Sequence, residues 1–244
     1  DPGDEVVLFE PFYDSYLASV TMAGAVPRYV QLHAPDGTHT AWWLDDAELE
    51  AAFGPRTRLV ILNTPHNPTG KVFTRTELER IGELARAHGA VIVSDEVYEH
   101  LTFDGRRHVR PATLPNLADH VLTVSSGGKT FSLTGWKVGW HLGPRDLVAA
   151  VQKAHQWITF CTPPAFQAAI GKALALPDAY FEGFVADYAR RRAFLSDALI
   201  RAGFEVLPCE GTYFLMARTD RHRRLDEDDV AFCRRLVTEH GLAA

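Results

Sequence analysis

A lysine in a glycine-rich segment is the most reactive group that the sequence offers. Lys129 directly follows Gly127-Gly128 and precedes a stretch rich in Phe, Leu and Trp. Lysine is scarce in this chain, at five residues against 20 arginines, yet a second one, Lys137, lies in the same segment. Because an amine held among apolar groups can act as a nucleophile toward an aldehyde, the pattern predicts covalent chemistry at Lys129.

Two earlier segments also carry polar side chains directly after short apolar runs. In residues 63–70, two prolines and a glycine restrict the backbone around Asn67, so its amide either projects toward a ligand or lies in a simple tight turn. In residues 94–100, Asp95 and Tyr98 share a face if a helical turn begins there, with a helix cap and a core aromatic as the alternative. Ligands of open α/β sheets bind beyond the carboxyl ends of the strands, so we expect the three segments to meet at one site.

Short apolar runs alternate with amphipathic stretches of helix length along most of the chain. This alternation predicts an α/β fold with a mostly parallel sheet and helices on both faces. The pattern changes near Pro177, which predicts a large domain over 1–177 and the beginning of a smaller α+β domain over 178–244. The expected strands are 6–9, 28–32, 59–62, 91–94, 121–125, 138–142, 204–207 and 212–216, and the expected helices are 12–23, 45–53, 74–88, 146–160, 180–201 and 226–240.

Composition and charge exclude several classes of function. The formal net charge of −6 disfavours nucleic acid as a partner, and no apolar run approaches the ~18 residues that a membrane span needs. The 11 histidines and three well-separated cysteines form no zinc-site pattern, so no metal site is expected. Cysteines without a C-x-x-C pair also indicate a reducing compartment, and we expect a cytoplasmic protein.

A nucleotide-binding P-loop is the alternative interpretation of Gly128-Lys129-Thr130. The P-loop requires a glycine five positions before Gly128, where this chain has Thr123 within an expected strand. The acidic segment at Asp95 also precedes the lysine segment, whereas P-loop NTPases normally have the opposite order. The sequence therefore disfavours an NTPase.

The motifs together resemble the class I/II aminotransferases, which are pyridoxal-phosphate enzymes of fold type I. Within that family they are most similar to the kynurenine/glutamine transaminase and methionine aminotransferase branch. The motifs stand in the order of the family and extend over the whole chain: Asn67-Pro68-Thr69-Gly70, Ser94-Asp95-Glu96-Val97-Tyr98, Ser126-Gly127-Gly128-Lys129-Thr130-Phe131-Ser132, Thr134-Gly135-Trp136-Lys137 and Gly211-Thr212-Tyr213-Phe214.

The resemblance implies a role for each site residue. Lys129 is expected to form the Schiff base with the cofactor aldehyde and, once released, to move a proton at the substrate α-carbon. Asp95 is expected to keep the pyridine nitrogen protonated, which makes the ring a good electron acceptor. The remaining cofactor-binding residues are expected to hold the 3′ oxygen of the ring, by Asn67 and Tyr98, and the phosphate, by Ser126 and Lys137.

By the same resemblance, we expect an aminotransferase that moves an amino group between an amino acid and a 2-oxo acid. A pyridoxal-phosphate-dependent cysteine-conjugate β-lyase and an inactive structural fragment are the alternatives. The chain is expected to be a piece of a longer protein, with a phosphate-binding loop and a ring-stacking aromatic before Asp1 and the substrate-carboxylate arginine after Ala244. Homodimers are typical of the family, so a homodimer is expected of the intact protein.

Overall fold

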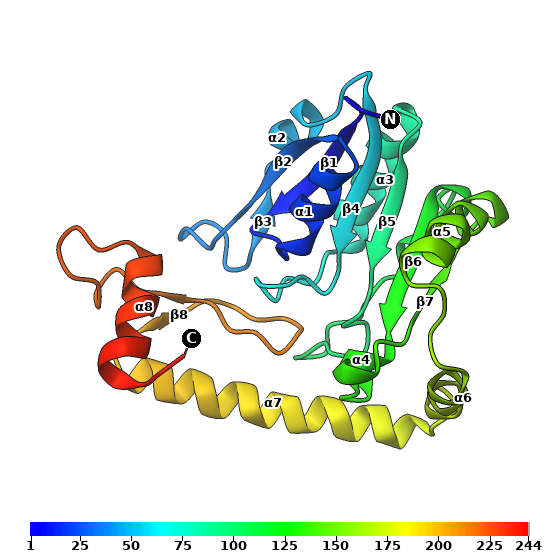
Figure 1. Ribbon diagram of the computed structural model, residues 1–244. Coiled ribbons are helices and arrows are strands. Elements are labelled where there is room, and N and C mark those ends of the chain that lie inside the picture. Colours follow the sequence, from blue (N-terminus) through cyan, green and yellow to red (C-terminus); the bar gives the residue numbers. More distant parts are fainter. Residues whose placement is uncertain (244) are drawn as a thin grey trace.

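A mixed β-sheet forms the centre of the computed structural model, which describes residues 1–243 (Figure 1). The strand order is β3-β2-β1-β4-β5-β6-β7. Neighbours among β2, β1, β4, β5 and β6 pair in parallel, while β3 and β7 add antiparallel edges. The predicted α/β class with a mostly parallel sheet is confirmed. The strands are β1 (Glu5–Glu10), β2 (Val26–His33), β3 (Trp43–Leu44), β4 (Thr57–Asn63), β5 (Val91–Asp95), β6 (Val121–Ser126) and β7 (Gly139–Leu142), followed by a separate hairpin of β8 (Glu205–Val206) and β9 (Ala217–Arg218).

Helices cover both faces of the sheet. Successive side chains of a strand point to opposite faces, so apolar residues on each face need a helix to bury them. In β1, Val6 and Leu8 pack with Val20 of α1, whereas Phe9 belongs to a larger core that includes Ile81 of α3. Figure 1 shows α1 in front of the sheet and α3 behind it. The helices are α1 (Ser15–Met22), α2 (Asp46–Ala51), α3 (Arg75–Ala87), α4 (Gly127–Thr130), α5 (Arg145–Ile158), α6 (Pro164–Ala173), α7 (Asp178–Arg201) and α8 (Asp229–His240).

Helix α3 shows how closely local sequence can set an element. Its N-cap Thr74 accepts a hydrogen bond from the backbone N–H of Glu77, and the Glu77 carboxylate accepts one from the backbone N–H of Thr74. Such a capping box satisfies backbone donors that a helix start otherwise leaves unpaired. Gly89, at φ +65°, follows the C-cap and turns the chain into β5.

The expected strand over 212–216 is wrong. The partner of β8 is β9 at 217–218, and Thr212 has a positive φ of 65° that interrupts an extended run. The backbone N–H of Thr212 donates to the carbonyl oxygen of Leu101 at 2.9 Å, so this segment packs against the loop beyond β5 instead of joining the hairpin. A tertiary contact therefore overrides the local β-propensity.

The long helix α7 runs from the sheet end near α4 and α6 toward the β8–β9 hairpin and α8 (Figure 1). It begins at Asp178, directly after Pro177. The division into 1–177 and 178–244 stays a prediction. Within residues 1–243, none of the helices combines the length and the apolar character that crossing a membrane requires.

Candidate active site

The loops after β4 and β5 meet where these two strands end. Asn63, the last residue of β4, pairs in register with Asp95, the last residue of β5. The Asn63 side chain donates to the carbonyl oxygen of Asp95 at 2.9 Å and accepts from the backbone N–H of Asn67 at 2.6 Å. One amide thus fixes the position of Asn67 relative to Asp95. Sequence reasoning missed Asn63, although it directly precedes the proline-rich turn and stands where the apolar run ends.

The Asp95 carboxylate is partly buried and turned toward α1. The Tyr16 hydroxyl donates to Asp95 Oδ2 at 2.5 Å, and the backbone N–H of Val97 donates to Oδ1 at 3.2 Å. Burial raises the pKa of Asp95, and these hydrogen bonds oppose that rise. Both donors are neutral, so in the described chain the carboxylate has hydrogen bonds but no cation bonded to it. A cationic N–H group is the partner that would offset its desolvation.

Tyr16 is a second residue that the sequence pattern did not single out. Its pKa is raised by burial and by the neighbouring Asp95 carboxylate, which keeps the hydroxyl protonated as a donor. Tyr13, which is 48% exposed, packs edge-on against Tyr16 with ring centroids 5.7 Å apart. The segment from Pro11 to Tyr16 follows the carboxyl end of β1, so the same rule that located the other loops could have found it.

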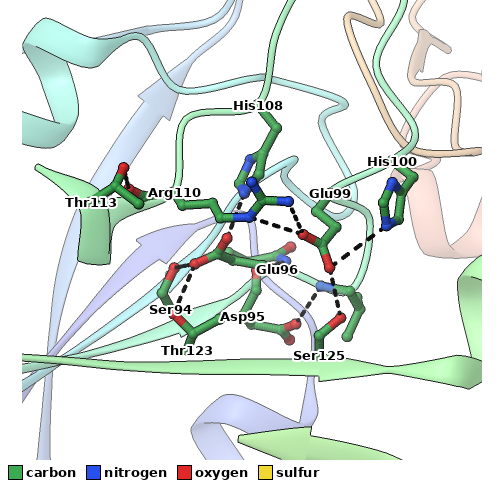
Figure 2. A network of polar contacts seen from close by, with 12 residues as sticks. Ser94, Asp95, Glu96, Glu99, His100, His108, Arg110, Thr113, Thr123 and Ser125 are labelled. Atoms are coloured by element: carbon green, nitrogen blue, oxygen red, sulfur yellow. Dashed lines mark hydrogen bonds and ion pairs between the residues drawn. The ribbon is translucent and has the colours of Figure 1, made fainter. Parts of the chain in front are cut away.

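A buried polar network anchors the loop that carries Asp95, and Figure 2 shows it. The Glu96 carboxylate accepts from Ser94 Oγ at 2.9 Å and from Thr123 Oγ1 at 3.2 Å. Its second oxygen lies 2.5 Å from Nε2 of His108, and both side chains of this pair are at most 5% exposed. Glu96 and Asp95 point in different directions in Figure 2, so one carboxylate anchors the loop while its neighbour faces α1.

Lys129 lies in the short helix α4, which the sequence analysis did not predict. Ser126 is its N-cap: the Ser126 hydroxyl accepts from the backbone N–H of Gly128 at 3.0 Å and donates to the carbonyl oxygen of Val138 at 3.3 Å. A Cβ atom on Gly127 would lie 2.5 Å from Cδ1 of Ile170. Gly127, two residues before Lys129, therefore allows close packing against Ile170 of α6.

The Lys129 amine lies between two tyrosine rings. Its Nζ donates to the Tyr213 hydroxyl at 3.0 Å and lies 5.9 Å from the ring centroid of Tyr98. Tyr98 is only 4% exposed, and its pKa is raised by burial and by the neighbouring Tyr213 hydroxyl. The fold thus brings Lys129 and Tyr98 together, and their loops end neighbouring parallel strands.

Lys137 differs from Lys129 because its side chain is exposed. It ends the 3₁₀ turn Thr134–Trp136 in a left-handed conformation with φ 54°. Two residues later, Gly139 pairs with Ser126 across the antiparallel β6–β7 ladder. The ladder therefore returns the chain from Lys137 to the edge of the sheet at which Ser126 caps α4.

The polar side chains of this site can be matched to the ligand groups that each would bind. A desolvated carboxylate suits a protonated ring nitrogen, an amine suits an aldehyde, and phenol and amide groups suit a ring hydroxyl. Ser126 and the exposed Lys137 suit a phosphate group. The set fits pyridoxal phosphate by chemistry, and within residues 1–243 no group of three or more His, Cys, Asp or Glu side chains could hold a metal ion.

Comparison with known proteins assigns the family. The sequence profile described as "Aminotransferase class I and II" matches residues 1–244. The chain belongs to this family. Class I and II aminotransferases depend on pyridoxal phosphate, so the family and the cofactor predicted from the sequence are confirmed.

The relatives are transaminases of several substrates. The chain is 41% identical to the kynurenine–oxoglutarate transaminase of Dictyostelium discoideum over 98% of its own length and 62% of that protein. It is 38% identical to the methionine aminotransferase of Escherichia coli, over 99% of its own length and 61% of that protein. The solved structure of N-succinyldiaminopimelate aminotransferase from Mycobacterium tuberculosis superposes with a TM-score of 0.93 at 44% identity, covering 100% of this chain and 62% of that one. The chain therefore spans less than two thirds of the length of these relatives.

Proposed function

We propose that the protein containing this chain is a pyridoxal-phosphate-dependent aminotransferase that moves an amino group between an amino acid and a 2-oxo acid. The observation that carries the proposal is the convergence of Asp95, Tyr98 and Lys129 at the carboxyl ends of β5 and β6. A desolvated carboxylate, a protonated phenol and a nucleophilic amine on rigid elements supply what this chemistry requires.

Asp95 and Tyr16 act on the ring end of the cofactor. When bound, pyridoxal phosphate supplies an electron-accepting ring for the pair released when the substrate α-proton leaves. Asp95 holds the proton on the ring nitrogen, and its partly buried position strengthens that charge pairing. Tyr16 orients the carboxylate by donating to Oδ2.

The other site residues hold the cofactor or move a proton. Lys129 would hold the cofactor through its aldehyde and, as a free amine, would move a proton to and from the substrate α-carbon. The 3′ oxygen is bound by Tyr98 and Asn67, and the phosphate by Ser126 and Lys137. Each role falls on a group whose backbone is fixed by the contacts described above, except for that of the exposed Lys137.

We also propose a cytoplasmic homodimer with a domain boundary near Pro177. The free thiols of Cys161, Cys209 and Cys233 are compatible with a reducing compartment.

The end of α5 exposes a cluster of large apolar side chains, with Trp157 at 84% and Ile158 at 83%, and such clusters mark surfaces that another chain or segment covers. Size-exclusion chromatography with light scattering on the whole gene product would show a monomer if the dimer proposal is wrong.

Covalent trapping tests the proposed function. Whole protein incubated with pyridoxal phosphate should show the visible absorption of a lysine-bound cofactor, and borohydride should convert it to a stable adduct that peptide mapping places on Lys129. Lys129→Ala should abolish the adduct, whereas Lys153→Ala, at an exposed position of α5, should retain it. An adduct on Lys137 or on the buried Lys71 would overturn the assignment.

Product analysis then separates the two activities open to such a site. A panel of amino acids with 2-oxo acids should give the matching aminated and oxidised products in equal amounts. Release of ammonia, a thiol and a 2-oxo acid from cysteine conjugates, with no aminated product, would instead assign a β-lyase.

A further inference from the structure

Tyr213 reaches the site from a distant part of the chain. It lies in the segment Gly211–Phe214, beyond α7. Hydrogen bonds fix this segment to the two loops that follow β4 and β5. The backbone N–H of Gly211 donates to the carbonyl oxygen of Gly70 at 2.8 Å. The backbone N–H of Thr212 donates to the carbonyl oxygen of Leu101 at 2.9 Å. Thr212 is fully buried, so the position of Tyr213 is set by main-chain contacts on each side of the site.

The Tyr213 ring completes an aromatic wall around the lysine. It packs edge-on against Tyr98 with centroids 5.2 Å apart and stacks on Tyr188 at 5.9 Å. Its hydroxyl accepts from Lys129 Nζ at 3.0 Å. A single phenol thus links the reactive amine to a residue that, by the proposed function, holds the cofactor ring.

We propose that Tyr213 is a positioning residue for Lys129, holding its amine toward Tyr98 whenever that amine is not bonded to the cofactor. The proposal rests on the proposed function, because it concerns the free amine of the cofactor-binding lysine. A lysine side chain has four flexible bonds, and a fixed acceptor at its end removes much of the freedom that otherwise slows reaction. The amine is thereby aimed at the place where it must meet either the aldehyde or the substrate α-proton.

The experiment separates positioning from binding by using two forms of the cofactor. Pyridoxamine phosphate lacks the aldehyde, so its affinity reports on the pocket alone, whereas pyridoxal phosphate reports on the reaction with Lys129. Tyr213→Phe, made in the whole protein freed of cofactor, keeps the ring contacts and removes the hydroxyl. It should slow covalent attachment about tenfold, as expected for one lost hydrogen bond, and leave pyridoxamine phosphate affinity within about twofold.

Tyr188→Phe is the matched control, because Tyr188 stacks on Tyr213 and its hydroxyl has no role in the proposal. It should leave both measurements within about twofold of the unaltered protein. Attachment at an unchanged rate in Tyr213→Phe would overturn the proposal, and so would an equal loss of pyridoxamine phosphate affinity, which indicates a structural role. If the unaltered protein bonds no cofactor at Lys129, the proposed function itself fails, and the two failures are thus distinct.

Discussion

The loops on the two sides of the site differ in how firmly their polar groups are held. The ring side comprises the loops proposed to hold the cofactor ring, and the lysine side is the loop that carries Lys129 and Lys137. On the ring side, the loops at 63–70 and 94–100 contain buried polar groups, among them His66, Thr69 and Glu96, each with a hydrogen-bond partner. On the lysine side, the loop at 126–137 has an exposed Ser132 and an exposed Lys137, both with positive φ. A ring that must be oriented in a low dielectric needs fixed donors, whereas a phosphate that stays partly hydrated can be bound by exposed point charges.

The first prediction tests whether charge at the ring side matters for chemistry. Asp95→Asn keeps the shape and removes the charge, so the ring nitrogen loses its stabilising anion. Turnover by the whole protein should fall about 10²–10⁴-fold, while attachment at Lys129 stays largely intact, because the carboxylate matters most when negative charge develops in the ring. Steady-state kinetics and the visible spectrum measure the two effects. Unchanged turnover with a lower melting temperature would reduce Asp95 to a turn-capping residue.

The second prediction contrasts two neighbouring carboxylates of the same loop. Glu96→Gln breaks a buried pair with His108 and disturbs bonds from Ser94 and Thr123, so it should lower the free energy of unfolding by about 2–4 kcal/mol. Glu99→Gln is the matched control. The Glu99 partner Arg110 is 56% exposed, and the loss should be below about 1 kcal/mol.

Urea unfolding of both variants decides whether burial distinguishes these carboxylates. Equal losses would mean that the buried contacts of Glu96 contribute no more than the ion pair between Glu99 and the exposed Arg110. A large loss for Glu96→Gln with unaltered pyridoxamine phosphate affinity would show that the anchor serves folding alone. If Glu96→Gln lowers both the unfolding stability and the affinity for pyridoxamine phosphate, the anchored loop also serves cofactor binding.

Most of the sheet and the residues proposed for the site could be predicted, because both leave local signals. Strands end in polar residues at a switch from apolar runs, and helix α3 carries its own capping box. Asn63, Tyr16 and Tyr213 were not predicted to contact the site residues. Their roles depend on contacts across 32, 79 and 84 positions of the chain, which no local pattern encodes.

The same reason explains the elements that were wrong or missed. The 212–216 segment has strand-like composition, but its hydrogen bond to Leu101 and the positive φ of Thr212 are tertiary properties. Helix α4 has only four residues, and its two glycines argue against a helix when the sequence is considered alone. Its N-cap Ser126 and the packing on Ile170 hold it in place.

The third prediction uses pH to probe the ring-side loop at 63–70. Burial lowers the pKa of His66 to about 3, and the nearby Lys71 charge also disfavours its protonation. The unfolded chain binds a proton near pH 6.5, whereas the folded one does not until about pH 3, so protonation favours unfolding between these values. Stability should therefore be fully present above pH 6.5 and should fall by about 1.4 kcal/mol per pH unit below it.

His66→Gln isolates this contribution, because glutamine does not titrate. From pH 6.5 to pH 5, the unaltered protein should lose about 2 kcal/mol more than the variant, measured by urea unfolding at each pH. Equal slopes would show that His66 is protonated in the folded loop. The Thr69 hydroxyl, 2.8 Å from His66 Nδ1, would then have to accept from the ring.

The last prediction concerns the exposed charge of Lys137 on the lysine side. Lys137→Ala removes one exposed cation, so it should weaken pyridoxal phosphate binding about tenfold, or ~1.5 kcal/mol, while unfolding stability stays within ~0.5 kcal/mol. Pyridoxal, which lacks the phosphate, should bind the variant and the unaltered protein equally well. Lys153→Ala, on the exposed surface of α5, is the control for loss of charge alone. A matching loss for pyridoxal would place Lys137 against the ring and remove the contrast between the two sides of the site.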